Sequence, residues 1–253
     1  MPDQGRPTSL QRRSAARTAV VWDALREVLD DVGRDGATVV DIGGGTGGFA
    51  VRVAELGHRV VVVDPSPDAL AILARRAEET GVADRVDGRQ GDLATVADVL
   101  ADAVPPGRAD VVLCHGVLEI VDDPAAALDA LAALLRPGGV LSLLVAQRHA
   151  AVVARAMAGH FQQARALLDD PAPPSGTPHR RFTADELEAA LDTAGFDTTA
   201  MHAVRVFVDL VPSSLVDLEP GAAGALVELE QAVSTRPEYL ALATQVHALA
   251  TRR

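Results

Sequence analysis

The sequence predicts an α/β fold in which a doubly wound, mostly parallel sheet has helices on both faces. Continuous apolar runs read as strands buried on both faces. These runs alternate along the chain with helical patterns, and a glycine-rich turn joins the first run to a helix. At 253 residues, 48% of them hydrophobic, the chain is long enough for one large domain.

The first predicted element is a helix over residues 10–29, since its apolar side chains recur at helical spacing with Trp22 beside them. Residues 1–9 are polar, contain two prolines and are expected to be disordered. Two interpretations of the helix stay open: a packing helix, or a cap (residues 1–35) that presents Arg13 and Arg17 to a substrate. The main domain would then cover residues 36–253.

The next strand, 38–42, runs into a glycine-rich turn and a helix over 49–56. Gly43, Gly45 and Gly47 allow positive φ and a close approach to a ligand. The spacing Gly43-x-Gly45-x-x-Gly48 also fits a dinucleotide-binding loop. Asp41 favours another ligand, because a carboxylate there would repel a diphosphate and attract the cationic amine of S-adenosylmethionine.

On Asp41, Gly43, Gly45 and Gly47, the sequence resembles the class I S-adenosylmethionine-dependent methyltransferases, whose first motif is acid-x-Gly-x-Gly-x-Gly. The resemblance implies a Rossmann-like, seven-stranded sheet with an antiparallel last strand. It also implies S-adenosyl-L-methionine as cofactor and S-adenosyl-L-homocysteine as product.

The second predicted strand, 59–64, ends in Asp64, near the spacing at which such folds place a carboxylate on ribose hydroxyls. A carboxylate can accept from two neighbouring hydroxyls at once. The alternative role is an N-cap for the helix predicted over 69–79.

A short third strand at 86–89 precedes Gly91-Asp92-Leu93. The resemblance implies that Asp92 accepts from the adenine amino group and that Leu93 packs on the ring. Asp92 could instead cap the helix that follows.

The fourth strand, 110–115, ends in Cys114 and His115, at the sheet edge where open α/β folds bind ligands. His115 therefore faces the predicted reaction site, or lines the methionine part of the cofactor. Cys114 is interpreted as a small buried residue. A helix from Asp123 to Leu135 and a strand over 140–145 follow.

Residues 147–182 interrupt the alternation with a helix over 150–168 and a proline-rich stretch, and we interpret them as a substrate lid. Thr183 and Glu186 form a capping box that opens the next helix. Residues 196–199 and 202–210 read as the final hairpin, and the rest of the chain is expected to be helical.

Charge and cysteine content limit the class of protein. The net charge of −12 argues against broad attraction to nucleic acid, although arginines gather at 6–17 and 148–181. All the basic side chains other than histidine are arginine. With one cysteine and no signal peptide or apolar run long enough to span a bilayer, we expect a cytoplasmic protein with no membrane and no metal site.

A closer resemblance covers nearly the whole chain. Runs at 17–22, 114–119, 136–143 and 204–209 are similar to the bacterial tRNA methyltransferases that esterify 5-carboxymethoxyuridine at the wobble position. A carboxylate is already a nucleophile at pH 7, so its attack on the methyl group needs no general base. By this resemblance Arg205 and Arg17 would clamp the carboxylate, with Arg13 and His115 helping. The alternative role of Arg205 is a salt bridge to Asp209 or Glu119.

The sequence thus predicts an enzyme that transfers methyl to a carboxylate oxygen, of a tRNA anticodon loop or of a small acid. The alternative is a small-molecule O- or N-methyltransferase of metabolism, which the acidic composition favours. A nicotinamide oxidoreductase fits the glycine loop but not Asp41 or residues 91–93. A catalytically silent S-adenosylmethionine sensor stays open, and no oligomer is predicted.

Overall fold

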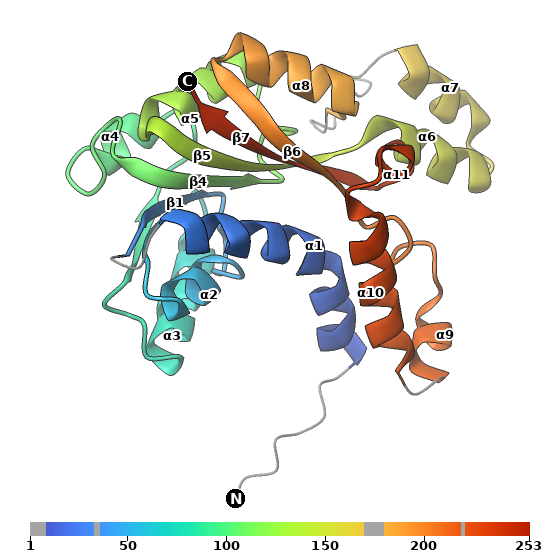
Figure 1. The fold of residues 1–253 in the computed structure, drawn as a ribbon, viewed down its shortest axis with the longest axis horizontal. Helices are drawn as coiled ribbons and strands as arrows, with labels where there is room; N and C mark the ends of the chain where they lie inside the picture. The colour runs from blue at the N-terminus through green and yellow to red at the C-terminus, as the bar shows by residue number, and fades with distance from the viewer. Residues whose placement is uncertain (1–8, 33–35, 170–179, 219–220) are drawn as a thin grey trace, which may run out of the picture.

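The computed structural model describes residues 9–32, 36–169, 180–218 and 221–253. A seven-stranded sheet with the strand order β3-β2-β1-β4-β5-β7-β6 forms the centre of the molecule (Figure 1). Strands β1 to β5 are mutually parallel, and β7 runs antiparallel to both β5 and β6. The predicted doubly wound sheet with one antiparallel strand is confirmed. The strands are β1 (Thr38–Ile42), β2 (Arg59–Asp64), β3 (Val86–Gln90), β4 (Ala109–His115), β5 (Leu135–Ala146), β6 (Phe196–Val204) and β7 (Gln245–Arg252).

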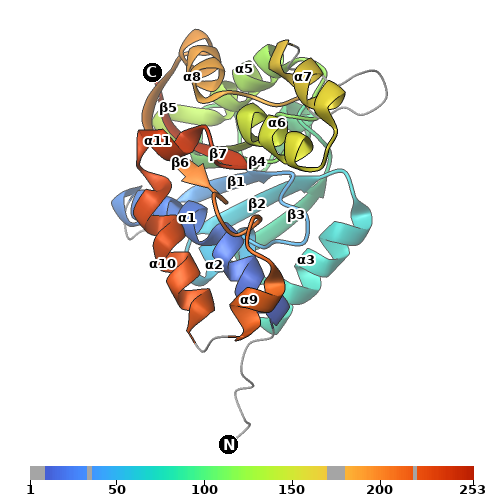
Figure 2. The same cartoon turned by 90° about the vertical axis from the view of Figure 1, so that its right-hand side faces the viewer.

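Helices cover both faces of the sheet (Figures 1 and 2). The helices of the main layers are α1 (Ser9–Val32), α2 (Ala50–Glu55) and α3 (Pro67–Glu79) on one face, and α4 (Val96–Leu100), α5 (Pro124–Leu134) and α8 (Ala184–Thr193) on the other. The remaining helices are α6 (Arg148–Met157), α7 (Phe161–Asp169), α9 (Ser213–Leu218), α10 (Ala222–Ser234) and α11 (Pro237–Leu240).

Alternating residues of each strand supply the two cores. Val39 and Val111 face α1–α3, whereas Val40 and Val112 face α4, α5 and α8. All four are fully buried, as expected for parallel strands covered on both sides. Leu25 and Leu29 place the second half of α1 in the first core, so this half of the helix is part of the domain's packing.

The segment after β5, which the sequence analysis interprets as a lid, differs from its predicted secondary structure. The helix predicted over 150–168 is two helices, α6 and α7, separated at Gly159, whose φ of 79° lies in the left-handed region. The capping box of Thr183 and Glu186 is confirmed by both of its hydrogen bonds. The proline-rich stretch at 170–179 and the predicted disorder at 1–8 lie outside the described residues.

The predicted final hairpin is wrong. Strand β6 continues unbroken from Phe196 to Val204, and residues 206–210 leave the sheet because Arg205 adopts φ 62°. The antiparallel strand is β7, in a segment expected to be helical. Its alanines and leucine favour a helix, but pairing with β5 and β6 on both sides overrides that preference.

Candidate active site

The glycine-rich turn after β1 has the backbone that its sequence predicts. Gly43, Gly45 and Gly47 all have positive φ, of 69°, 55° and 78°. A Cβ on Gly43 would lie 2.4 Å from Cγ2 of Val117, and one on Gly47 would lie 2.2 Å from Cδ1 of Leu73. A larger residue at Gly43 or Gly47 would therefore have to move its neighbour, whereas at Gly45 only the positive φ favours glycine.

Two acids lie under and beside this turn. The Asp41 side chain is beneath Gly44, where a Cβ would stand 2.5 Å from Oδ2 of Asp41. Asp41 is 3% exposed, and burial, with the nearby Asp64 charge, raises its pKa to about 7. Asp64 accepts from the N–H groups of Gly45 and Ser66, each at 2.9 Å. Asp64 thus fixes the glycine turn, and the N-cap of α3 is Ser66 instead.

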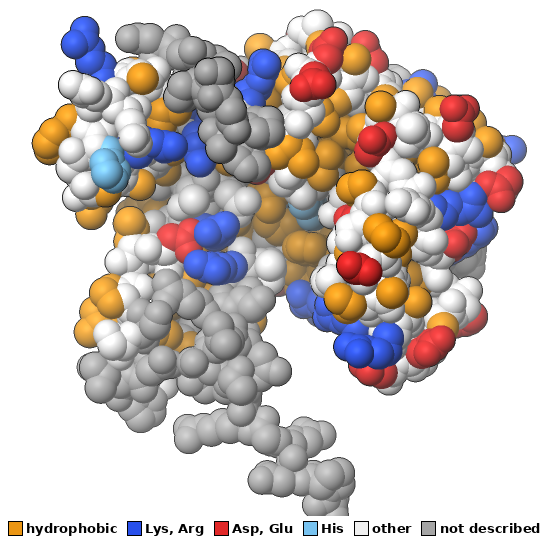
Figure 3. All heavy atoms as spheres, turned by 180° about the vertical axis from the view of Figure 1, so that it is seen from behind, with side chains coloured by type: hydrophobic (Ala, Val, Ile, Leu, Met, Phe, Trp, Pro, Cys, Tyr) orange, Lys and Arg blue, Asp and Glu red, His pale blue; other side chains and the backbone are white. Residues whose placement is uncertain are grey.

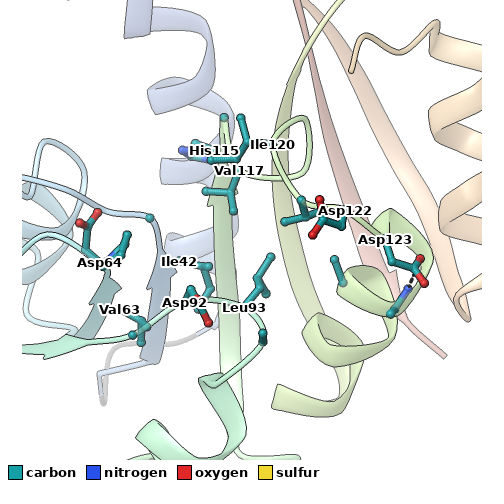
Figure 4. A pocket seen from close by; sticks show the side chains of 18 residues that line it. Ile42, Val63, Asp64, Asp92, Leu93, His115, Val117, Ile120, Asp122 and Asp123 are labelled. Atoms are coloured by element: carbon teal, nitrogen blue, oxygen red, sulfur yellow. Dashed lines mark hydrogen bonds between the residues drawn. The ribbon is translucent and has the colours of Figure 1, made fainter. Parts of the chain in front are cut away.

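A cavity of about 620 Å³ opens at the carboxyl ends of β1, β2 and β4. This volume is typical of a small-molecule site. Figure 4 shows Asp64 at one end, Asp122 and Asp123 at the other, and His115 and Ile120 above. Of the predicted cofactor residues, the cavity is lined by Gly43, Asp64, Asp92, Leu93 and His115. Asp41, Gly45 and Gly47 are not among its lining residues, and the Asp41 side chain lies beneath the turn at Gly44.

Asp92 and Leu93 form the floor of this cavity between Asp64 and α5 (Figure 4). Oδ1 of Asp92 accepts from the backbone N–H and the hydroxyl of Thr95, at 3.0 and 2.9 Å. Asp92 therefore does cap the turn that leads into α4, and it also lines the cavity. Leu93 is 8% exposed and presents an apolar side chain.

His115 closes the cavity at the end of β4. Its Nε2 lies 2.9 Å from the hydroxyl of Ser142, and its ring packs edge-on against Phe49 with centroids 4.9 Å apart. Its Nδ1 is buried and has no hydrogen-bond partner among the described residues. Burial lowers the pKa of His115 to about 4, so the ring is neutral at pH 7. Burial also raises the pKa of the neighbouring Cys114 thiol to about 12, which agrees with an inert core residue.

The structure brings the two predicted arginines together, although 188 positions separate them. Arg17 of α1 pairs with Oδ1 of Asp209 at 2.8 Å, and Arg205 pairs with Oδ2 at 2.5 Å. Nη1 of Arg205 also donates to Gln245, while its Nε is buried without a hydrogen-bond partner in the described part of the chain. These side chains are not among the residues that line the cavity. The Arg13 side chain is outside the described residues.

The turn that carries Arg205 is tied to a buried acid that the sequence analysis missed. Glu230 of α10 is fully buried. Its carboxylate accepts from the N–H groups of three successive residues, Val206, Phe207 and Val208, at 2.9, 2.8 and 2.7 Å. No local pattern links positions 206–208 with 230.

Arg205 and His115 lie at the same edge of the sheet, the one formed by the carboxyl ends of the parallel strands. Strand β6 is parallel to β4 and β5, so its end, with Arg205, lies at the same edge as His115. Val204 packs in one cluster with Phe49 and Leu144, and Phe49 contacts His115. Figure 3 shows a hollow near the centre of one side of the molecule, with hydrophobic and histidine side chains inside it.

The glycine turn, the acid beneath it and the cavity at the sheet's carboxyl edge define a methyltransferase domain. A family model described as "Methyltransferase domain" matches residues 12–201, and the chain belongs to this family. Its cofactor is S-adenosylmethionine, which its structural relatives bind as such or as S-adenosylhomocysteine. The residues present fit this cofactor: a glycine turn with positive φ, a buried acid beneath that turn, and a cavity lined by polar and apolar residues.

Two sequence relatives and one solved structure show which methyltransferases are similar to this chain. The tRNA 5-carboxymethoxyuridine methyltransferase of Escherichia coli (strain K12) is 31% identical over 93% of this chain and 88% of its own length. The ubiquinone biosynthesis O-methyltransferase of Xanthomonas euvesicatoria pv. vesicatoria is 37% identical over 63% of this chain and 62% of its own. Magnesium protoporphyrin IX methyltransferase of Synechocystis shares the fold, with a TM-score of 0.64 at 17% identity, over 99% of this chain and 90% of its own. In the described residues, no helix is long and apolar enough to cross a membrane.

Proposed function

We propose that this enzyme transfers a methyl group to a carboxylate oxygen, and that the acceptor is 5-carboxymethoxyuridine at the wobble position of tRNA. The observation that carries the proposal is the convergence of Arg17 and Arg205 on a single acid, Asp209. Two guanidinium groups against one carboxylate leave one positive charge, and Arg205 Nε has no partner among the described residues. A second carboxylate, from the acceptor, would satisfy both.

Bound S-adenosylmethionine supplies a methyl group on a sulfonium centre. We propose that Asp64 accepts from the ribose hydroxyls, Asp92 and Leu93 hold the adenine, and Asp41 attracts the amine. The glycines at 43, 45 and 47 leave room for the backbone of the turn to contact the cofactor. The carboxylate needs no base, so Arg205, Arg17 and His115 have only to hold it in line and exclude water.

Two sets of helices outside the sheet would complete the site in this proposal. Helix α1 acts as the cap that presents Arg17, with Arg13 on the same helix. Helices α6 and α7 act as the lid, and they carry Arg155 and Arg165. Arg148, by contrast, is 8% exposed and paired with Glu186, so it supports the lid and is not available to a substrate.

A small anionic acid is the second candidate acceptor. It is favoured by the net charge of −12 and by the similarity to ubiquinone biosynthesis O-methyltransferases. RNA affinity depends largely on phosphate contacts, and an acidic protein offers few.

Two synthetic anticodon stem-loops test the proposal. One has 5-carboxymethoxyuridine at the wobble position and the other has unmodified uridine there. Incubation with S-adenosylmethionine should add one methyl group, detected by nucleoside mass spectrometry, to the first RNA only. Absence of methylation of the first RNA, under conditions where a small acid is methylated, would contradict the tRNA acceptor.

A further inference from the structure

A chain of hydrogen bonds leads from the cavity across four adjacent strands. His115 Nε2 lies 2.9 Å from Ser142 Oγ, which lies 2.8 Å from His247 Nε2. His247 Nδ1 lies 3.2 Å from His202 Nδ1. The residues come from β4, β5, β7 and β6, which are consecutive in the sheet.

The strand register puts the four side chains on one face. His247 stands opposite His202 on β6, and His115, Leu144 and His247 are in register across β4, β5 and β7. Ser142 is opposite Leu113, two residues before His115 and therefore on the same face. Leu113 belongs to the core under α1, so the chain runs beneath α1.

The residues at the two ends of this hydrogen-bond chain are less buried than, or differently placed from, the two in its middle. Ser142 and His247 are fully buried, whereas His202 is 9% exposed and His115 lines the cavity. Burial lowers the pKa of His202, and the exposed Glu27 of α1 opposes that effect. The His202 end is therefore the one at which a positive charge is best tolerated.

The donors and acceptors of the chain can be ordered in two ways. Each neutral imidazole has one N–H and one lone pair, and the Ser142 hydroxyl donates to one histidine while it accepts from the other. If His115 Nε2 donates to Ser142, then Ser142 donates to His247, and His247 donates to His202. That order leaves a lone pair on His115 Nδ1 and an N–H on His202 Nε2, which Glu27 favours.

A proton that reaches His115 cannot remain there. The ring holds a proton poorly in its buried position, since burial lowers its pKa to about 4. In the order just given, each member can pass its own proton to the next one. The charge then moves to His202, where the negative charge of Glu27 favours it, without any group leaving its place.

We propose that His115, Ser142, His247 and His202 relay a proton from the cavity to strand β6 beneath α1, and that this relay suits the site to a second class of acceptor, a hydroxyl. A carboxylate gives up no proton on methylation and has no use for such a chain. The proposal rests on methyl transfer at this cavity and is independent of the carboxylate acceptor proposed above.

Methyl transfer to a hydroxyl breaks two bonds and moves one proton. The O–H bond of the acceptor breaks, and a C–O bond to the transferred methyl group forms. The electrons of the broken S–C bond return to sulfur, which becomes a neutral thioether. The proton of the hydroxyl goes to His115 Nδ1, and the proton of His247 Nδ1 arrives at His202.

Nitrogen NMR of the full chain, labelled with ¹⁵N-histidine and saturated with S-adenosylhomocysteine, tests the order of the chain. At pH 7 we expect His115 to be neutral with its proton on Nε2. We also expect His202→Gln to shift the His115 signals, although Ser142 and His247 separate the two residues. A His115 proton on Nδ1 would overturn the proposal.

Product chemistry tests the acceptor class, with 3,4-dihydroxybenzoate as a probe that offers both a carboxylate and phenolic hydroxyls. Mild alkali cleaves a methyl ester and leaves a methyl ether. We expect both products, and an ether-to-ester ratio that falls about a hundredfold in Ser142→Ala, the size of a general-base contribution. Ser234→Ala, which removes another buried serine hydroxyl, one that donates to the backbone of Gln231 and takes no part in the relay, is the control and should leave the ratio unchanged.

The ether and ester products distinguish the relay from the carboxylate acceptor. No ether, or an ether-to-ester ratio that Ser142→Ala does not change, would overturn the relay even if ester forms. Ether without ester would support the relay and count against the carboxylate acceptor.

Discussion

Asp41 and Asp64 lie near the carboxyl ends of neighbouring strands, but the two side chains have different surroundings. Asp64 accepts two backbone N–H groups, and its side chain reaches the cavity. Asp41 is sealed beneath Gly44, and burial raises its pKa to about 7. A carboxylate in such a place is costly to ionise, and a nearby cation would lower that cost.

The raised pKa of Asp41 makes the stability of the ligand-free protein depend on pH. The folded protein holds this proton up to about pH 7, whereas an aspartate in the unfolded chain has its ordinary pKa of 3.8. The resulting stability is complete below pH 4 and is lost as the pH rises to 7, by roughly 4 kcal/mol. Urea unfolding of the wild type and Asp41→Asn across this range should show the wild type losing stability relative to the variant. Parallel pH profiles would contradict the assignment.

Replacing Asp64 should weaken cofactor binding. Asp64→Ala removes the acceptor proposed for the ribose and frees the N–H of Gly45, so we expect affinity for S-adenosylhomocysteine to fall by about 1–3 kcal/mol. Isothermal titration calorimetry measures this change. Asp68→Ala, an exposed acid on α3, is the control. Unchanged affinity of Asp64→Ala would exclude the ribose role.

Residues that act within one local motif could be predicted from the sequence. The glycines at 43, 45 and 47 have the positive φ that the motif requires, and Asp64 and His115 do line the cavity. Glu230 and the partners of His115 could not be predicted, because their contacts join positions 22 to 105 apart that no periodic pattern relates.

At the scale of elements, the turn after β6 is the least regular part of the site and the most firmly held. Arg205 is the one described non-glycine residue with positive φ, a conformation that costs about 1–2 kcal/mol. Three hydrogen bonds from residues 206–208 to Glu230 oppose this cost. The turn therefore holds Arg205 and Asp209 in place before any substrate binds.

Glu230→Gln should loosen this turn. The amide group can accept fewer of the three N–H bonds, and we expect a loss of about 1–3 kcal/mol in unfolding free energy. Turnover should fall while affinity for S-adenosylhomocysteine stays unchanged. Glu228→Gln, an exposed position on the same helix, is the control. A Glu230→Gln protein of wild-type stability would show that these bonds do not hold the turn.

The variant Arg205→Gly removes the guanidinium group and also relieves the backbone strain at this position, so it tests the role of the side chain by itself. Glycine tolerates a φ of 62°, so the fold should persist, while turnover on a carboxylate falls about a hundredfold from lost positioning. Steady-state kinetics and thermal unfolding measure the two effects. Loss of folding with no specific loss of turnover would assign Arg205 a purely structural role, through its ion pair with Asp209.

The elements themselves were predictable where helix and strand have distinct local patterns. Strands β1, β2 and β4 each contain a run of apolar residues, and the helix caps at Thr183 and Asp123 are local. Strand β7 was not predictable, since its composition favours a helix and only pairing with β5 and β6 makes it a strand. Residues 206–208 read as a strand and are instead bound by Glu230.

At the scale of the whole molecule, the charge distribution bears on the acceptor. The chain is acidic overall, yet Arg155 and Arg165 lie on the lid helices and Arg180 and Arg181 follow them. Burial lowers the pKa of Arg181, as does Arg155 nearby, while Glu119 opposes both. Basic side chains are thus concentrated on one part of a negatively charged molecule.

If these arginines contact RNA phosphates, binding of total tRNA should weaken steeply with salt. Replacing Arg155 and Arg165 by alanine should weaken binding and reduce the slope of log K against log salt by about one for each lost contact. Arg75→Ala, an exposed arginine on α3, is the control. No tRNA binding by the wild type at low salt would leave a small acid as the acceptor.

The chemistry of the product tests the central proposal, methylation of a carboxylate, most directly. The protein is incubated with methyl-labelled S-adenosylmethionine and a host lysate, which is then separated into tRNA and small molecules and treated with mild alkali. We expect label in the tRNA fraction that alkali releases, as from a methyl ester. Alkali-labile label in small molecules alone would keep the carboxylate and exclude RNA, whereas label that resists alkali in both fractions would contradict the proposal.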